Sequence, residues 1–116
     1  MSTRQRGNKR ENVVMRHLED LGYFCYASRG SRGIDIIALS PKDQILPHLG
    51  IEAGGRSKSV KEAFAKMRAS ANFPGMLLLV VREVKVKNRN RLRWHATDGV
   101  HGHDSFESAL EAAGDL

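Results

Sequence analysis

The sequence has few of the features that build secreted and membrane proteins. Its 116 residues include one cysteine, Cys25, so no disulfide can form within the chain. No apolar run approaches the roughly 20 residues that span a bilayer, and the longest runs from Met76 to Val81. Early positive charge with no apolar stretch behind it predicts that there is no signal peptide. These absences favour a cytoplasmic protein with no membrane partner, with Cys25 as a core residue rather than a nucleophile.

Acids are scarce in the segments where bases are densest. Lysine and arginine number 19 against 13 acids, for a net charge of +6. Residues 1–10 carry no acid, residues 54–68 and 82–93 carry one each, and residues 98–116 carry acids but no lysine or arginine. This segregation predicts a surface directed at a polyanion such as nucleic acid. The alternative is a set of solvated faces that maintain solubility.

Apolar periodicity predicts one α/β domain over residues 1–116. Helices are expected at 8–21, 60–69 and 105–113, the last capped by Asp104 or Ser105, and strands at 23–28, 34–39, 45–53, 76–84 and 91–96. A hairpin turn is expected at 87–90, and the strand at 34–39 is expected to be buried on both faces. The order α-β-β-β-α-β-β-α predicts a mixed central β-sheet flanked by helices.

Three acids occupy positions where a carboxylate is costly to bury. Glu11 falls on the same helical stripe as Val14 and Leu18, Asp35 interrupts an apolar strand, and Glu52 follows another. An unpaired buried carboxylate costs several kcal/mol, so a compensating partner is expected. A divalent cation such as Mg²⁺ is one such partner. A salt bridge to an arginine, or a strand end in water, is the alternative.

The segments around these acids resemble a known family. Gly7-Asn8-Lys9-Arg10-Glu11 at a helix start, Gly33-Ile34-Asp35-Ile36-Ile37-Ala38 on a strand and Ile51-Glu52-Ala53 on the next are similar to the PD-(D/E)XK nuclease superfamily. The polar loop before Asp35 and the short chain resemble archaeal-type Holliday junction resolvases most. The match covers about residues 6–69. The resemblance implies a restriction-endonuclease-like fold and a magnesium-dependent endodeoxyribonuclease that resolves four-way DNA junctions in recombination and repair.

The resemblance also implies roles for particular residues. Glu11, Asp35 and Glu52 would bind Mg²⁺, with Mn²⁺ as a substitute, and Ser31, or less favourably Ser28, would contribute to catalysis from its loop. The expected DNA-binding residues are Arg4, Arg6, Lys9, Arg10, Arg29, Arg32, Arg56 and Lys61. A homodimer would supply two active sites for two symmetric cuts. The apolar candidates for its interface are Phe64, Met67, Phe73 and Met76.

One position departs from the family pattern. The family has a lysine two residues after the second acid, where this sequence has Gly54. We expect Lys58 to supply the missing cation, because Gly54-Gly55 permits the chain to fold back; Arg56 is a weaker substitute. If no lysine serves, a non-catalytic nucleic-acid-binding module is the alternative. A nuclease acting on other branched or nicked DNA, and an interaction domain with salt-bridged acids, also remain open.

Overall fold

The structure is a computed structural model that describes residues 3–27, 34–42, 46–55, 59–70, 76–96 and 102–114, with the backbone alone at 3–8, 55, 70, 113 and 114. Its elements are α1 (Thr3–Asp20), β1 (Phe24–Ala27), β2 (Ile36–Leu39), β3 (His48–Gly55), α2 (Val60–Ser70), β4 (Met76–Val86), β5 (Arg89–His95) and α3 (Phe106–Gly114). The order α-β-β-β-α-β-β-α and the α/β class confirm the sequence prediction.

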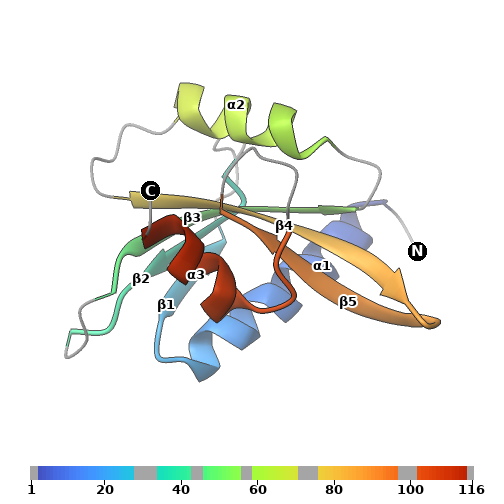
Figure 1. Ribbon diagram of the computed structural model, residues 1–116, viewed down its shortest axis with the longest axis horizontal. Helices are drawn as coiled ribbons and strands as arrows, with labels where there is room; N and C mark the ends of the chain where they lie inside the picture. The colour runs from blue at the N-terminus through green and yellow to red at the C-terminus, as the bar shows by residue number, and fades with distance from the viewer. Residues whose placement is uncertain are drawn as a thin grey trace.

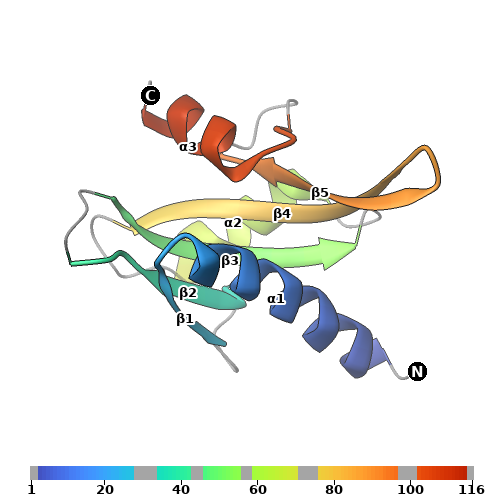
Figure 2. The ribbon, with the colours of Figure 1, turned by 90° about the horizontal axis from the view of Figure 1, so that it is seen from below.

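A five-stranded mixed sheet forms the middle layer, and its strands follow one another in chain order, β1-β2-β3-β4-β5. β1, β2 and β3 pair antiparallel, β3 and β4 pair parallel, and β4 and β5 form an antiparallel hairpin. The parallel pair needs a crossover connection, which contains α2. Figure 1 shows α2 on one face of the sheet and α1 and α3 on the other, and Figure 2 shows the α1 face directly.

Alternating side chains divide the core into two clusters, one on each face of the sheet. On the α1 face, Val14 and Leu18 pack with Ile51, Val81 and other strand residues, all buried. On the α2 face, Phe64 and Met67 pack against Val80. Neighbours in a strand point to opposite faces, so Glu52 and Arg82 point toward the α2 face.

Local capping explains where the helices begin and end. Gly22, with φ +99°, follows α1, and its N–H donates to Glu19 O at 2.9 Å. The positive φ suits glycine at a helix C-terminus. Ser59 Oγ accepts from Glu62 N at 3.2 Å and caps α2, and Ser105 Oγ accepts from Ser108 N at 3.1 Å and caps α3. Of the two expected caps of α3, Ser105 is therefore the one used.

Several expected boundaries and exposures differ from the structure. α1 already begins at Thr3, and the hairpin turn is only Lys87-Asn88, because both residues adopt positive φ (53° and 65°). A two-residue turn of this kind matches the twist of the flanking strands, so β4 and β5 continue up to it. β2 is not buried on both faces, since Leu39 is 37% exposed.

Two of the expected interface residues lie inside the molecule. Phe64 and Met67 are 1% and 0% exposed, because they form the apolar face of α2 that packs on the sheet. Met76 is half-buried at the start of β4, and Phe73 lies outside the described residues. In the part of the chain that the structure describes, no helix is both long and apolar enough to cross a membrane.

Candidate active site

A buried ion pair between Glu52 and Arg82 is the centre of the candidate site. Arg82 Nη2 donates to Glu52 Oε2 at 2.7 Å, and Arg82 Nη1 donates to Glu52 Oε1 at 3.2 Å. The two side chains are only 11% and 3% exposed. This bidentate geometry is the strong form of an arginine–carboxylate pair. The salt bridge that the sequence left open as an alternative is therefore present at Glu52.

Arg82 also connects the strands to the start of α2. Its Nη1 donates to Val81 O at 3.0 Å, and its Nη2 donates to Ser59 O at 3.4 Å. Ser59 is the N-cap of α2. The guanidinium thus has hydrogen bonds in a place where water is nearly absent, which offsets part of the cost of its burial.

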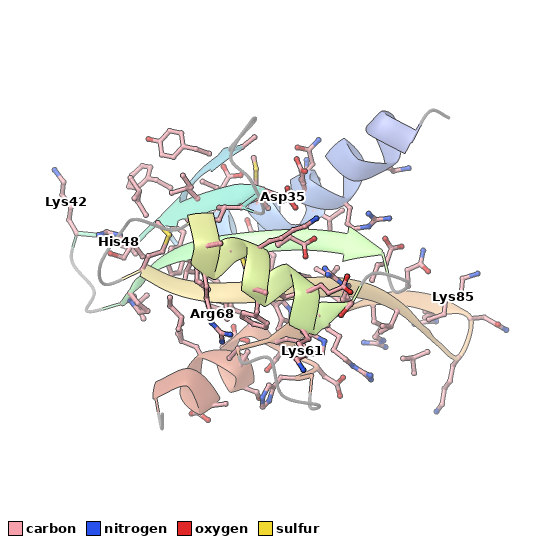
Figure 3. All side chains as sticks on the ribbon, turned by 90° about the horizontal axis from the view of Figure 1, so that it is seen from above. Asp35, Lys42, His48, Lys61, Arg68 and Lys85 are labelled. Carbon is pink, nitrogen blue, oxygen red and sulfur yellow. The ribbon has the colours of Figure 1, made fainter. Side chains whose placement is uncertain are left out.

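Asp35, labelled in Figure 3, lies immediately before β2. It is hydrogen-bonded to β3 on both sides of Glu52. Its backbone N–H donates to Ile51 O at 2.8 Å, and its Oδ2 accepts from Ala53 N at 2.9 Å. The side chain thus satisfies a backbone donor of the neighbouring strand. Asp35 is consequently held beside the backbone of β3 at Glu52.

Glu11 is not brought into the same group. It is half-buried on α1, on the helix stripe of Val14 and Leu18 that packs against the sheet face opposite Glu52. Among the described residues, no three acidic, histidine or cysteine side chains are grouped closely enough to hold a metal ion. Asp35 and Glu52 nevertheless supply two hard carboxylates, and Mg²⁺ typically needs only one or two beside water and phosphate oxygens. Asp35 and Glu52 are thus of the donor type that Mg²⁺ takes, with Glu52 already accepting from Arg82 at both oxygens.

The other two expected catalytic residues, Ser31 and Lys58, lie outside the described residues, and so do the expected DNA-binding residues Arg29, Arg32 and Arg56. The side chains of Arg4 and Arg6 are likewise not described. Lys9 and Lys61 are exposed, as DNA-binding residues must be. Arg10 instead forms an ion pair with Glu83, at 3.2 Å between Nε and Oε2, which partly neutralises it.

The register of β3 and β4 places a cation at the position without a side chain. Gly54 is paired with Arg82 across the parallel strands, two residues after Glu52 is paired with Val80. Sequence reasoning sought a cation along the same segment as Glu52 and missed Arg82. A signal was present, because Arg82 interrupts the apolar strand Met76–Val84 and a charge there requires a buried partner.

His95 is a buried polar residue of β5 that lies near Arg82. It is 8% exposed, and Val80 is its cross-strand partner. Burial lowers the pKa of His95, and the nearby Arg82, Arg93 and His103 lower the pKa further. His95 is therefore neutral at pH 7 and adds no charge of its own beside Arg82.

Cys25 agrees with its expected role as a packing residue. It is half-buried on β1, and its Sγ lies 3.7 Å from Met15 O. Burial, with a smaller contribution from the Glu19 carboxylate, raises the pKa of the Cys25 thiol to about 11. The reactive thiolate is thus scarce at neutral pH.

Neither a protein-family model nor a curated protein sequence matches the chain significantly.

Proposed function

We propose that the protein is a magnesium-dependent, structure-selective DNA endonuclease of the PD-(D/E)XK type that resolves four-way junctions. The observation that carries the proposal is the position of Asp35, which lies immediately before β2 and is hydrogen-bonded to the residues before and after Glu52 on β3. The order α-β-β-β-α-β around this pair and the net charge of +6 support it. Two acids alone would repel a polyanionic substrate. A metal ion held between them and the phosphate would explain why so basic a chain has both acids at this place.

Asp35 and Glu52 are the residues that would hold Mg²⁺. A carboxylate has about four lone-pair directions, so Glu52 can serve a cation while it accepts from Arg82. When bound, the ion would supply Lewis-acid activation of water and neutralisation of phosphate charge. Asp35 is fixed for this role by its bond to Ala53 N, which holds one carboxylate oxygen in place.

Arg82 takes the place of the lysine that is absent at Gly54. Its guanidinium lies against Glu52, on the strand position paired with Gly54. A fixed cation there stabilises negative charge that develops on a phosphate held at the acid pair. Arginine does not exchange protons near neutral pH, so Arg82 would act by charge and orientation, not as a base. Lys58 remains the alternative cation from the sequence analysis.

A homodimer remains part of the proposal, with a different surface from the one expected. Phe24 and Tyr26 on the edge strand β1 are 61% and 57% exposed, and Leu39, paired with Phe24, is 37% exposed. An exposed apolar edge strand favours pairing with another chain. A second copy of this chain, bound there, would place two acid pairs on one junction.

The test is a cleavage assay on a four-way junction, a duplex and single strands of the same sequence, in Mg²⁺, in Mn²⁺ and in EDTA. We expect cutting of the junction that needs the metal. Arg82→Lys, which keeps the charge but loses the two-pronged contact, should cut more slowly with unchanged junction binding. If folded wild-type protein cuts none of these substrates in either metal, the nuclease proposal is wrong.

A non-catalytic nucleic-acid-binding module is the second candidate. It is favoured by the two hydrogen bonds that Arg82 donates to both oxygens of Glu52, and by the missing side chain at Gly54. In that case the acid pair is a structural ion-pair cluster. Tight junction binding in EDTA, with no cutting in Mg²⁺ or Mn²⁺, would identify this function instead.

A further inference from the structure

The end of the β4–β5 hairpin extends beyond the rest of the sheet. Among the described residues, β3 pairs with β4 as far as Gly55 and Glu83, whereas Val84–Val86 of β4 pair with Arg89–Arg91 of β5. Figures 1 and 2 show this two-stranded segment projecting past the helices, and Lys85 is labelled on it in Figure 3. We call residues 84–91 the basic ribbon.

The basic ribbon has four positive charges and no acid. Lys85, Lys87, Arg89 and Arg91 are all exposed, and none of them forms an ion pair with another residue of the described chain. The hairpin residues that form ion pairs with described residues lie outside the ribbon, where Glu83 pairs with Arg10, Arg82 with Glu52 and Arg93 with Asp104. Four cations without an ion-pair partner among the described residues, gathered on a narrow projection, create a positive local potential that attracts an anionic partner.

The turn at the tip of the ribbon keeps a lysine against its backbone preference. Lys87 and Asn88 have φ values of 53° and 65°. Such a turn favours asparagine, aspartate or glycine at both positions, and another residue there costs on the order of 1 kcal/mol. Asn88 satisfies the preference, but Lys87 does not. The outermost point of the hairpin is therefore a charge retained at a cost in stability.

A groove continues the positive surface from the ribbon to α1. It has a volume of about 430 Å³ and is lined by Lys9, Arg10, Val13, Glu83, Asn90, Arg91 and Leu92. Two of its exposed cations come from different elements, Lys9 from α1 and Arg91 from β5. An elongated anion that contacts the ribbon can thus extend toward the first helix, which carries further arginines in its sequence.

We propose that the basic ribbon is an arm that binds the phosphate backbone of one DNA duplex without reading its sequence. The choice of DNA as the partner of this surface rests on the proposed function. A two-stranded β-ribbon fits the major groove of B-DNA, and lysine and arginine on its edges can reach the phosphates. Lys87 directly follows β4 and is seven residues from Val80, the register partner of Glu52, or about 23 Å along the strand. That distance is less than one helical turn of DNA, so one duplex can contact the ribbon near its cleavage point.

The test measures binding in EDTA, so that it does not depend on cleavage. Lys85→Gln/Lys87→Gln is compared with Lys42→Gln/Lys66→Gln, which removes two exposed lysines elsewhere. Fluorescence anisotropy with a labelled duplex and a four-way junction gives the affinity across salt concentrations. The ribbon variant should bind about 10-fold more weakly, and its salt slope should fall by about 2, since each lost phosphate contact removes about 0.9. The control should change affinity less than about 2-fold.

A second variant separates binding from folding. Lys87→Asn suits the turn better, so its thermal midpoint should rise while its DNA affinity falls. If both ribbon variants bind DNA like wild type, the ribbon is not a DNA arm, whether or not the protein cuts. If the ribbon binds anionic lipid vesicles or an acidic protein but does not bind DNA, then DNA is the wrong partner. Ribbon-dependent DNA binding without any cutting would support the arm and leave the nuclease proposal refuted.

Discussion

Gly54 and Arg82 are register partners on the parallel strands β3 and β4, and the guanidinium of Arg82 is hydrogen-bonded to Glu52, two residues before Gly54. The side chain absent from one strand is thus matched by a cation from its neighbour. Arg82 is 3% exposed and has hydrogen bonds to Val81 O and Ser59 O as well. Both the stability of the sheet and the proposed chemistry depend on this contact. Variants of Arg82 and Glu52 must therefore be measured for unfolding and for cleavage.

We expect Arg82→Leu to lower the free energy of unfolding by about 3–5 kcal/mol, because it leaves Glu52 buried without its partner. Glu52→Gln/Arg82→Leu should cost clearly less than the sum of the two single changes. Urea denaturation measures each value. Arg91→Leu is the control, an exposed arginine expected to change stability by less than about 0.5 kcal/mol. Additive losses in the double variant would contradict a coupled pair.

Asp35→Asn should slow cleavage by on the order of 100-fold or more while junction binding is retained. Asparagine still offers an oxygen to Ala53 N, so the fold is kept while the negative charge is lost. Single-turnover cutting in Mg²⁺ and binding in EDTA measure the two effects. Glu52→Gln is less clean, because it also weakens the pair with Arg82. Cutting at the wild-type rate would show that Asp35 holds no metal.

The element order and the acid pair could be predicted from sequence, but the cation beside them could not. Apolar runs such as Ile34–Leu39 determine strands locally, and an acid within such a run marks itself as unusual. The contact of Arg82 with Glu52 depends instead on the register of two parallel strands joined through a helix. Nothing within either strand fixes that register. The sequence therefore predicts the cation at Lys58, which is nearer to Glu52 along the chain. The sequence also predicts a longer turn, at 87–90, and hence a shorter β4–β5 hairpin than the structure has. Lysine is unusual in a two-residue turn, so Lys87 does not mark one.

His95 should make the protein less stable in mild acid. Burial and the neighbouring Arg82, Arg93 and His103 lower the pKa of His95 below 6.5. Below pH 6.5 the unfolded chain takes up a proton that folded His95 resists, so stability falls as the pH drops. His95→Gln should lose this part of the dependence. Thermal midpoints from about pH 5 to 8 check it; parallel curves for the two proteins would mean that His95 titrates normally.

Cys25 should react slowly with iodoacetamide. Because the pKa of its thiol is raised from 9.0 to about 11, the thiolate fraction near pH 8 is roughly 100-fold lower than for a free thiol. Alkylation followed by mass spectrometry, in native buffer and in denaturant, measures the difference. Equal rates in the two conditions would place the thiol in open solvent.

Phe24→Ser/Tyr26→Ser should shift the protein toward monomer. Both side chains are more than half exposed on β1, and their removal takes the apolar surface from the sheet edge. Val13→Ser is the control, because Val13 is 53% exposed on α1, away from β1. Sedimentation at several concentrations measures the state. A wild-type protein that stays monomeric throughout, or a dimer unaffected by the β1 changes, would rule out this interface.

The sheet's strand order, which follows the chain order, has a consequence for synthesis. Each strand pairs with the strand made just before it, so a chain leaving the ribosome can build the sheet from one edge without displacing an earlier pairing. Only the parallel step from β3 to β4 must wait, because 20 residues (76 − 55 − 1) separate the two strands. Contacts distant in sequence form slowly, since loop closure must come first. Arg82 emerges with the second strand of that step, so until then Glu52 has no partner from β4. The nascent chain therefore receives its buried cation late, after the acid with which it pairs.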